Sequence, residues 1–318
     1  LVADMLAVRL AGAWTKREGY DFNEITDRPV NGRDLWSARV TVGFEPTEWL
    51  RGNLIWEHFE EDDNRSRTGK QLCHRDPGRQ TVGATNVVND PTNPFKTQLR
   101  PALFSQGCQP GSLYDDGAFD MPNGLALPFV FAPLALGAYC GPLCQVVYPL
   151  GRDAANRPQT LLQIQDPYAS GQQSGGLRTI ASILDPRYRA KADVIELNLD
   201  IDLGESLTLY SQTAYNEDEV YSFQDFNRFN TQPIFTDTLT LSTTFDGDFR
   251  QLAPGGVFCD PQIGCSNRMA AFDISQAEGK QFSQELRLQS SFDGPINFSL
   301  GANYTEFETL VDYYVFNN

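Results

Sequence analysis

Histidine and long apolar runs are both scarce in this sequence. Only two histidines, His58 and His74, occur among 318 residues, and no Cys-x-x-Cys pair is present, so no zinc site or other metal site is predicted. The mean hydropathy is -0.38, and no run of about 20 apolar residues exists, which excludes a helical membrane protein. A membrane β-barrel is not excluded, because its lipid-facing residues alternate with polar ones.

Positive charge is also scarce. The chain has 25 Lys and Arg against 41 Asp and Glu, a formal charge of -16, which argues against a nucleic-acid partner because phosphate contacts need a basic face. The negative charge would suit a surface that meets divalent cations or cationic ligands. The alternative is that it only keeps the protein soluble. No Gly-x-Ser-x-Gly, His-Glu-x-x-His or P-loop sequence occurs, and no serine has a histidine close to it in the sequence. We therefore expect no enzyme activity, no catalytic residue and no cofactor.

The six cysteines suggest disulfides in an oxidising compartment. Two pairs are close in sequence within turn-rich segments, which leaves a third pair by elimination. Six cysteines allow about 15 pairings, and free thiols remain an alternative. The candidate pairs are Cys140–Cys144, Cys259–Cys265 and Cys73–Cys108.

Seven segments alternate apolar and polar residues with the period of two that is typical of β-strands. In the clearest one, Ile195, Leu197 and Leu199 oppose Glu196 and Asn198. Each segment has about 10–15 residues, enough to cross a bilayer, whereas ordinary strands average about 5–6. The segments cover 5–18, 34–45, 48–61, 192–203, 206–220, 281–292 and 295–308.

Short and long connections alternate along the chain. Tight turns are predicted at 45–48, 204–205 and 293–295, and long connections at 19–33, 62–191 and 221–280. Compact soluble domains rarely carry such long irregular segments, but membrane barrels have short turns at one rim and long loops at the other. We therefore predict an all-β fold, an antiparallel transmembrane β-barrel segment of about seven long strands. Residues 62–191 would form a large extracellular loop and 221–280 a second one.

Several polar groups invite a functional interpretation. The acidic run 60–64 could bind calcium, although it lacks the spacing of an EF-hand loop, and a solvated surface is the simpler interpretation. Alternation predicts that Asp200 and Asp202 face the lumen, as do Glu285 and Arg287, where they would be hydrated or paired across strands or with a plug. The uncharged stretch 121–151 contains several prolines, so we expect a loop subdomain with its own apolar cluster rather than a membrane helix.

Three stretches resemble barrel segments of TonB-dependent outer-membrane receptors. Residues 9–23 read RLAGAWTKREGYDFN, and residues 34–40 read DLWSARV before a proline-containing turn. Residues 284–290 read QELRLQS, and residues 300–304 read LGANY, a pair similar to a later hairpin of that family. The resemblance covers the strands, which make up less than half of the chain.

The resemblance implies a complete barrel of about 22 strands, a plug in its lumen, and a TonB box that contacts TonB. Residues 1–318 would then be a partial barrel without the plug, the TonB box and the remaining strands. The implied function is TonB-dependent uptake of a ferric siderophore, cobalamin or an oligosaccharide across the outer membrane of a Gram-negative bacterium. Outer-membrane lipid, TonB and the small-molecule or oligosaccharide substrate would be the partners.

Loop aromatics are the candidate ligand contacts, and packing within their own loops is the alternative. The candidates are Tyr148, Phe223 and Phe226.

Two other functions remain compatible with the sequence. A passive porin-like channel would share the alternation but have no plug. A secreted soluble glycan-binding β-protein would hide the apolar faces inside a sandwich.

Overall fold

The chain is an all-β protein built around one large antiparallel sheet. The computed structural model describes residues 5–86, 104–125, 144–147, 161–164, 166–169, 171–235, 240–242, 249–251, 254–262 and 264–317. Within these residues there is one turn of 3-10 helix, η3 (Pro254–Gly256), and no helix is long and apolar enough to cross a membrane.

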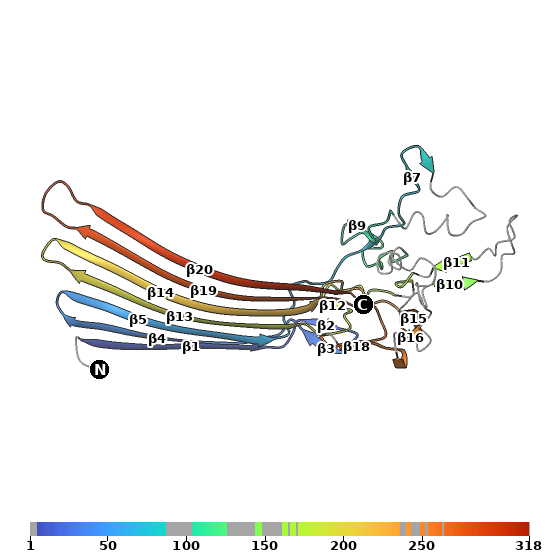
Figure 1. Cartoon of the computed structure of the whole chain (residues 1–318), viewed down its shortest axis with the longest axis horizontal. Coiled ribbons are helices and arrows are strands. Elements are labelled where there is room, and N and C mark those ends of the chain that lie inside the picture. Colours follow the sequence, from blue (N-terminus) through green and yellow to red (C-terminus); the bar gives the residue numbers. More distant parts are fainter. Residues whose placement is uncertain are drawn as a thin grey trace.

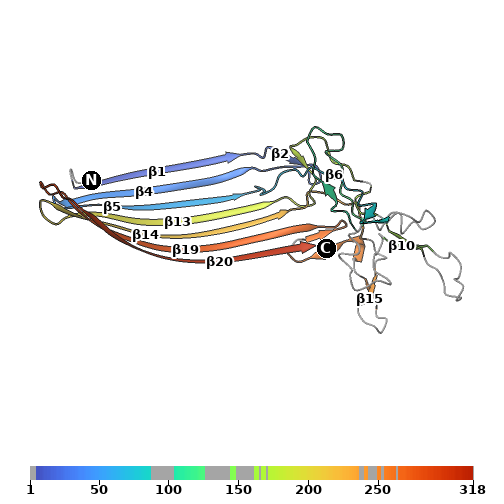
Figure 2. The same cartoon turned by 90° about the horizontal axis from the view of Figure 1, so that it is seen from above.

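Seven long strands lie side by side in the order β1-β4-β5-β13-β14-β19-β20, and every neighbouring pair is antiparallel. The long strands are β1 (Leu6–Arg17), β4 (Arg33–Thr47), β5 (Leu50–Asp63), β13 (Arg187–Asp202), β14 (Leu207–Asp225), β19 (Ala271–Ser290) and β20 (Ser299–Asn317). Figure 1 shows the three hairpin turns at one end of the sheet and the short elements gathered at the other. In Figure 2, β1 and β20 form the two edges of a curved sheet.

Short strands occupy the long connections. One three-stranded sheet joins two connections that are far apart in sequence, because β12 (Thr179–Ile180) pairs with β2 (Asp21–Asn23), which pairs with β3 (Arg28–Val30). The other short pairs are β6 (His74–Arg75) with β9 (Cys108–Gln109), β7 (Thr81–Val82) with β8 (Thr85–Asn86), β10 (Cys144–Val147) with β11 (Leu161–Ile164), β15 (Thr240–Ser242) with β16 (Phe249–Gln251), and β17 (Phe258–Asp260) with β18 (Gly264–Ser266).

The long strands extend further towards the loop end than the alternation predicts. β13 begins at Arg187 rather than 192, β14 ends at Asp225 rather than 220, and β19 begins at Ala271 rather than 281. The predicted loops 62–191 and 221–280 are therefore too long at both ends. The physical reason is that backbone pairing needs only a partner strand, whereas the alternation ends where the positions that were apolar become charged, as at Asp193, Glu217 and Lys280.

One predicted turn is also too short. The β19–β20 connection runs from Ser291 to Phe298, so residues 295–298 are not part of a strand. Asn297 closes this connection, because its Oδ1 accepts the Phe292 amide at 2.6 Å and its Nδ2 donates to the Phe292 carbonyl at 3.1 Å. Pro295 has no amide proton and cannot donate a hydrogen bond between the strands. The Asn297 side chain instead makes hydrogen bonds to the backbone of Phe292.

The connections fold onto one another as a head at the loop end of the sheet. One apolar cluster joins two connections, because Cys73, Met121 and Tyr168 lie between β5 and β13 and Phe229 lies between β14 and β19. A second cluster consists of residues on the ends of β14 and β19 together with two partly buried residues that precede β13. Its members include Phe223, Ala270, Phe272 and Ile274, with Ile183 and Leu184 packed against them. The head is therefore continuous with the sheet.

Candidate functional site

The register of the sheet separates two faces. Residues paired directly across antiparallel strands lie on the same face, so the pairs Leu10–Val40, Val40–Trp56, Trp56–Ile195 and Ile195–Tyr215 trace one face across five strands. These side chains are not covered: Ile195 is 50% and Leu10 is 74% exposed. We call this face the apolar face and the opposite one the polar face.

The apolar face has a defined height. On β1 its outward positions are apolar or glycine from Leu6 to Trp14. On β13 every outward position from Ile195 to Ile201 is apolar, and Leu203 continues the row into the turn. Both stretches cover about nine residues, close to the 9–11 with which a tilted strand crosses the hydrocarbon of a bilayer.

A row of ionisable side chains bounds the apolar face on the loop side. Directly paired residues of five neighbouring strands form this row: His58, Asp193, Glu217, Lys280 and Glu308. On β5, β13, β14 and β19 the change from apolar to ionisable side chains falls at this one register position, so the boundary is level across these four strands. β20 departs from the pattern one row lower, where Glu306 accepts a hydrogen bond from the Tyr304 hydroxyl at 3.1 Å.

The apolar face contains one small polar group, and its members bond to one another. Thr213 Oγ1 donates to Gln284 Oε1 at 2.6 Å, and Gln284 Nε2 donates to Ser211 Oγ at 3.1 Å. These three side chains therefore satisfy one another without a partner from the surroundings.

On the polar face, side chains at about the same level as this polar group are also joined by hydrogen bonds. Asn198 Nδ2 donates to Asn53 Oδ1 at 3.1 Å and to Glu196 Oε1 at 2.8 Å, and Gln212 Nε2 donates to Glu196 Oε1 at 2.7 Å. The face therefore presents amides and carboxylates to whatever lies against it.

The lumen candidates of the sequence lie on this face. Asp202 pairs with Arg51 at 2.9 Å and accepts the Thr208 hydroxyl at 2.9 Å. The guanidinium of Arg287 on β19 stacks over the Tyr210 ring on β14, 4.6 Å from its centroid, so Arg287 makes a contact across strands, with an aromatic ring.

A short segment after β5 crosses the polar face at its loop end. We call Asn64–Thr68 the rim strap. Arg65 Nη2 lies 3.2 Å from Glu61, and the Arg65 guanidinium sits 3.5 Å from the centroid of the Tyr188 ring on β13. The strap therefore leaves its own strand and runs over the neighbouring one.

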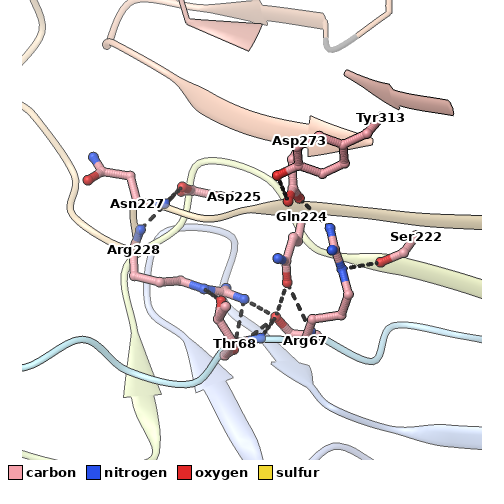
Figure 3. Close-up of polar contacts among 10 residues, drawn as sticks. Arg67, Thr68, Ser222, Gln224, Asp225, Asn227, Arg228, Asp273 and Tyr313 are labelled. Atoms are coloured by element: carbon pink, nitrogen blue, oxygen red, sulfur yellow. Dashed lines mark hydrogen bonds and ion pairs between the residues drawn. The ribbon is translucent and has the colours of Figure 1, made fainter. Parts of the chain in front are cut away.

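Arg67 carries the strap on to β14 and β19, as Figure 3 shows. Its Nε donates to Ser222 Oγ at 2.9 Å, and its Nη2 lies 2.6 Å from Asp273 Oδ1. Its backbone amide donates to Gln224 Oε1 at 2.9 Å. Tyr313 on β20 donates its hydroxyl to the other oxygen of Asp273 at 2.9 Å. Arg67 thus connects the strap directly to two strands of the rim, β14 and β19, and Asp273 links it to a third, β20.

Arg228, which follows β14, holds the end of the strap. Its Nε donates to Thr68 Oγ1 and its Nη2 to the Thr68 carbonyl, both at 3.0 Å, and Nη2 also bonds Ser66. The side chain is buried, and Nη1 has no hydrogen-bond partner among the described residues. Burial lowers the pKa of the Arg228 guanidinium, against the opposing effect of nearby carboxylates, of which Asp225 is the strongest.

The acidic run 60–64 is divided between the two faces. Glu61 and Asp63 lie on the polar face, where Arg33 Nη1 is 3.6 Å and 3.7 Å from them, respectively. Asp62 points to the other face and pairs with Arg189 at 3.3 Å. No group of three metal-ligating side chains occurs in the part of the chain that the structure describes, so these contacts offer no support for a calcium site.

Two of the three predicted ligand-binding aromatics, Phe223 and Phe226, lie among the described residues. Phe223 is only 6% exposed and stacks on Phe272 in the apolar cluster, so it has almost no surface for a ligand. Phe226 is partly buried, and its amide donates to the Ala271 carbonyl. Tyr148 lies outside the described residues. Alternation continued beyond residue 220 would have placed Phe223 on the apolar face, away from a ligand on the polar face.

Two of the three predicted disulfides are present. Cys73 bonds Cys108, and Cys259 bonds Cys265. Cys140, from the third predicted pair with Cys144, lies outside the described residues.

The two histidines belong to different parts of the molecule. His58 lies 2.8 Å from Asp193 on the sheet, whereas His74 lies 3.6 Å from Asp115 in the head. The two imidazoles thus have different carboxylate partners.

Three arginines of the site were not predicted from the sequence, namely Arg65, Arg67 and Arg228. A signal for the first two was available, because Arg65 and Arg67 keep the period of two just after the acidic run. Nothing local marks Arg228, which reaches the strap only through the folded head.

Comparisons with known proteins leave the family open. No protein-family model matches the chain, and no curated protein matches it. Among solved structures, a chain from the structure of the RagAB peptide importer in the 'closed-closed' state is similar, with 9% identity and a TM-score of 0.28. The match covers 98% of this chain and 28% of that chain, so this chain spans well under half of its length. A likeness at that TM-score carries no argument about function.

Proposed function

We propose that the chain is the part of an outer-membrane β-barrel that serves TonB-dependent uptake of a scarce nutrient. A ferric siderophore, cobalamin or an oligosaccharide would be the substrate. The sheet would cross the outer membrane of a Gram-negative bacterium, with the apolar face towards lipid and the polar face towards the lumen. A plug and TonB box elsewhere in the protein would couple it to TonB.

The single observation that supports this best is the level boundary of the apolar face. An uncovered apolar surface of about nine residues in height is unfavourable in water but favourable in a bilayer. The ionisable row that starts with His58 follows at one register position across five strands. The long strands, short hairpins and folded head agree with the same orientation.

Quenching of tryptophan fluorescence tests the membrane part of the proposal. Trp14, Trp36 and Trp56 lie on the apolar face, with exposures of 70%, 40% and 39%. In liposomes, lipids brominated along their acyl chains should quench the full-length protein strongly. A protein that stays dispersed in buffer without detergent, and is not quenched, would contradict this placement.

Energy dependence separates active uptake from the passive porin-like alternative. Deleting TonB in the host should abolish uptake and leave binding to the cell surface intact. Uptake that continues without TonB would favour a passive channel. The exposure of residues such as Ile195 argues against the soluble sandwich alternative, because a sandwich would bury them against a second sheet.

A further inference from the structure

The rim strap occupies the entrance to the polar face. Its contacts extend from Glu61 on β5, over Tyr188 on β13, to Ser222 on β14 and Asp273 on β19. A solute that moves along the polar face over β13 and β14 from the loop end meets this segment. The consequence for transport rests on the proposed function, whereas the closure itself does not.

The strap has no apolar side chain. Its sequence is Asn-Arg-Ser-Arg-Thr, so lifting it would remove no apolar surface of its own from a core. What holds it is hydrogen bonds and ion pairs, which water can replace once the segment is released. A segment held in this way can detach without unfolding the sheet beneath it.

The residues that bind the strap also favour its release. Asp273 keeps the hydroxyl of Tyr313 at 2.9 Å when Arg67 leaves, so the carboxylate retains a donor. Arg228 Nη1 has no partner among the described residues while the strap is in place, so the closed arrangement leaves one donor unsatisfied. The Tyr313 bond lowers the free-energy cost of opening relative to a carboxylate left with no donor, and the unsatisfied Nη1 makes the closed arrangement less stable than one in which every donor is paired.

We propose that the rim strap is a releasable latch that controls access of solutes to the polar face, with the Arg67–Asp273 pair as its catch. The closed position is the one in Figure 3. In the open position Arg67 leaves Asp273 and Ser222, and the strap moves away from β14 and β19.

Hydrogen–deuterium exchange of the full-length protein in detergent micelles tests the latch. The amides of Ser66 and Arg67 donate to side chains, Asn31 Oδ1 and Gln224 Oε1, so their exchange reports on the strap itself. Asp273→Asn and Arg67→Ala should each speed exchange of residues 64–68 by about tenfold or more, because each breaks the ion pair that fastens the strap. Exchange in the middle of β13 should stay unchanged.

Asp62→Asn is the matched control, because its pair with Arg189 lies at the same rim on the exposed, opposite face. It should leave exchange of the strap unchanged. In cells, Asp273→Asn but not Asp62→Asn should increase entry of a polar dye conjugate too large for general porins. Unchanged exchange, exchange that rises throughout β13 and β14, or unchanged dye entry would each overturn the latch. Failure of lipid quenching would instead contradict the membrane placement and leave the exchange result intact.

Discussion

The sheet and the head are stabilised in different ways. The sheet is held by long antiparallel ladders, and its apolar side chains at Leu10, Ile195 and Leu286 stay exposed. The head has short strands, and it is held by two disulfides, a small apolar cluster and buried carboxylates such as Asp166. The sheet thus leaves its apolar face uncovered, whereas the head has buried apolar residues of its own.

Removing the Cys73–Cys108 disulfide should have the largest effect on the head. The bond closes a loop with a sequence separation of 35 and lies in the apolar cluster with Met121 and Tyr168. Replacing both cysteines by alanine should destabilise the head by about 2–5 kcal/mol. Limited proteolysis should show faster cleavage in the head and an unchanged sheet. Equal loss of protection in β13 would mean that the two regions unfold as one unit.

A charge on the apolar face should destabilise the sheet in a bilayer. Leu10→Arg should cost about 2–4 kcal/mol in liposomes, the range for a basic residue near the bilayer midplane. Ala7→Arg on the polar face of the same strand, opposite Gly43, is the control and should cost far less. Urea unfolding midpoints of the folded, inserted protein measure both. Equal midpoints for the two variants would argue that neither face meets lipid.

Removing the buried negative charge of Asp166 should have a smaller effect, confined to the head. It accepts the amides of Gly124 and Tyr168, at 3.1 Å and 2.8 Å, and pairs with Arg75. Asp166→Asn keeps the size but removes the charge, and should destabilise the head by about 1–3 kcal/mol. Exchange of the Tyr168 amide should rise, while that of the β13 amides does not. A variant that also loosens β13 would show coupling between head and sheet.

Asp76 should give the head a modest dependence on pH. Burial alone would raise its pKa, but hydrogen bonds from the Gln106 and Gly78 amides and from Gln109 outweigh this and lower the pKa. The bonds therefore add stability above the unfolded pKa of about 4, and this stability is lost as the pH falls through the lower folded pKa.

The stability difference between the wild-type head and Asp76→Asn should accordingly be full at pH 7 and shrink below pH about 4. Thermal unfolding of the head at several pH values measures this difference. A difference that stays constant down to pH 2 would show that the hydrogen bonds do not depend on the charge.

Much of the sheet could be predicted from the sequence. Alternation along 192–203 and 281–292 identifies β13 and β19 and assigns Asp202 to the polar face, because the period of two fixes which side chains share a face. The strand ends could not be predicted in this way. β19 continues back to Ala271 because β14 and β20 provide ladder partners, which the alternation of one segment does not reveal.

The candidate site was less predictable. The pairing of Cys73 with Cys108 follows from elimination among the cysteines, but the burial of Phe223 depends on Phe272 and on Ile183 and Leu184, which come from other parts of the chain. The contact between Arg67 and Asp273 joins residues far apart in the sequence, so no local pattern predicts it.

The sequence by itself determined the seven long strands, their two unlike faces and the hairpin turns, because alternation and turn chemistry are local properties of the chain. Only the tertiary structure decided which strands extend past the alternation, that Phe223 is buried, and that Asn64–Thr68 folds over the polar face. Those outcomes depend on contacts between residues far apart in sequence, and such contacts form only when the sheet and the head are brought together.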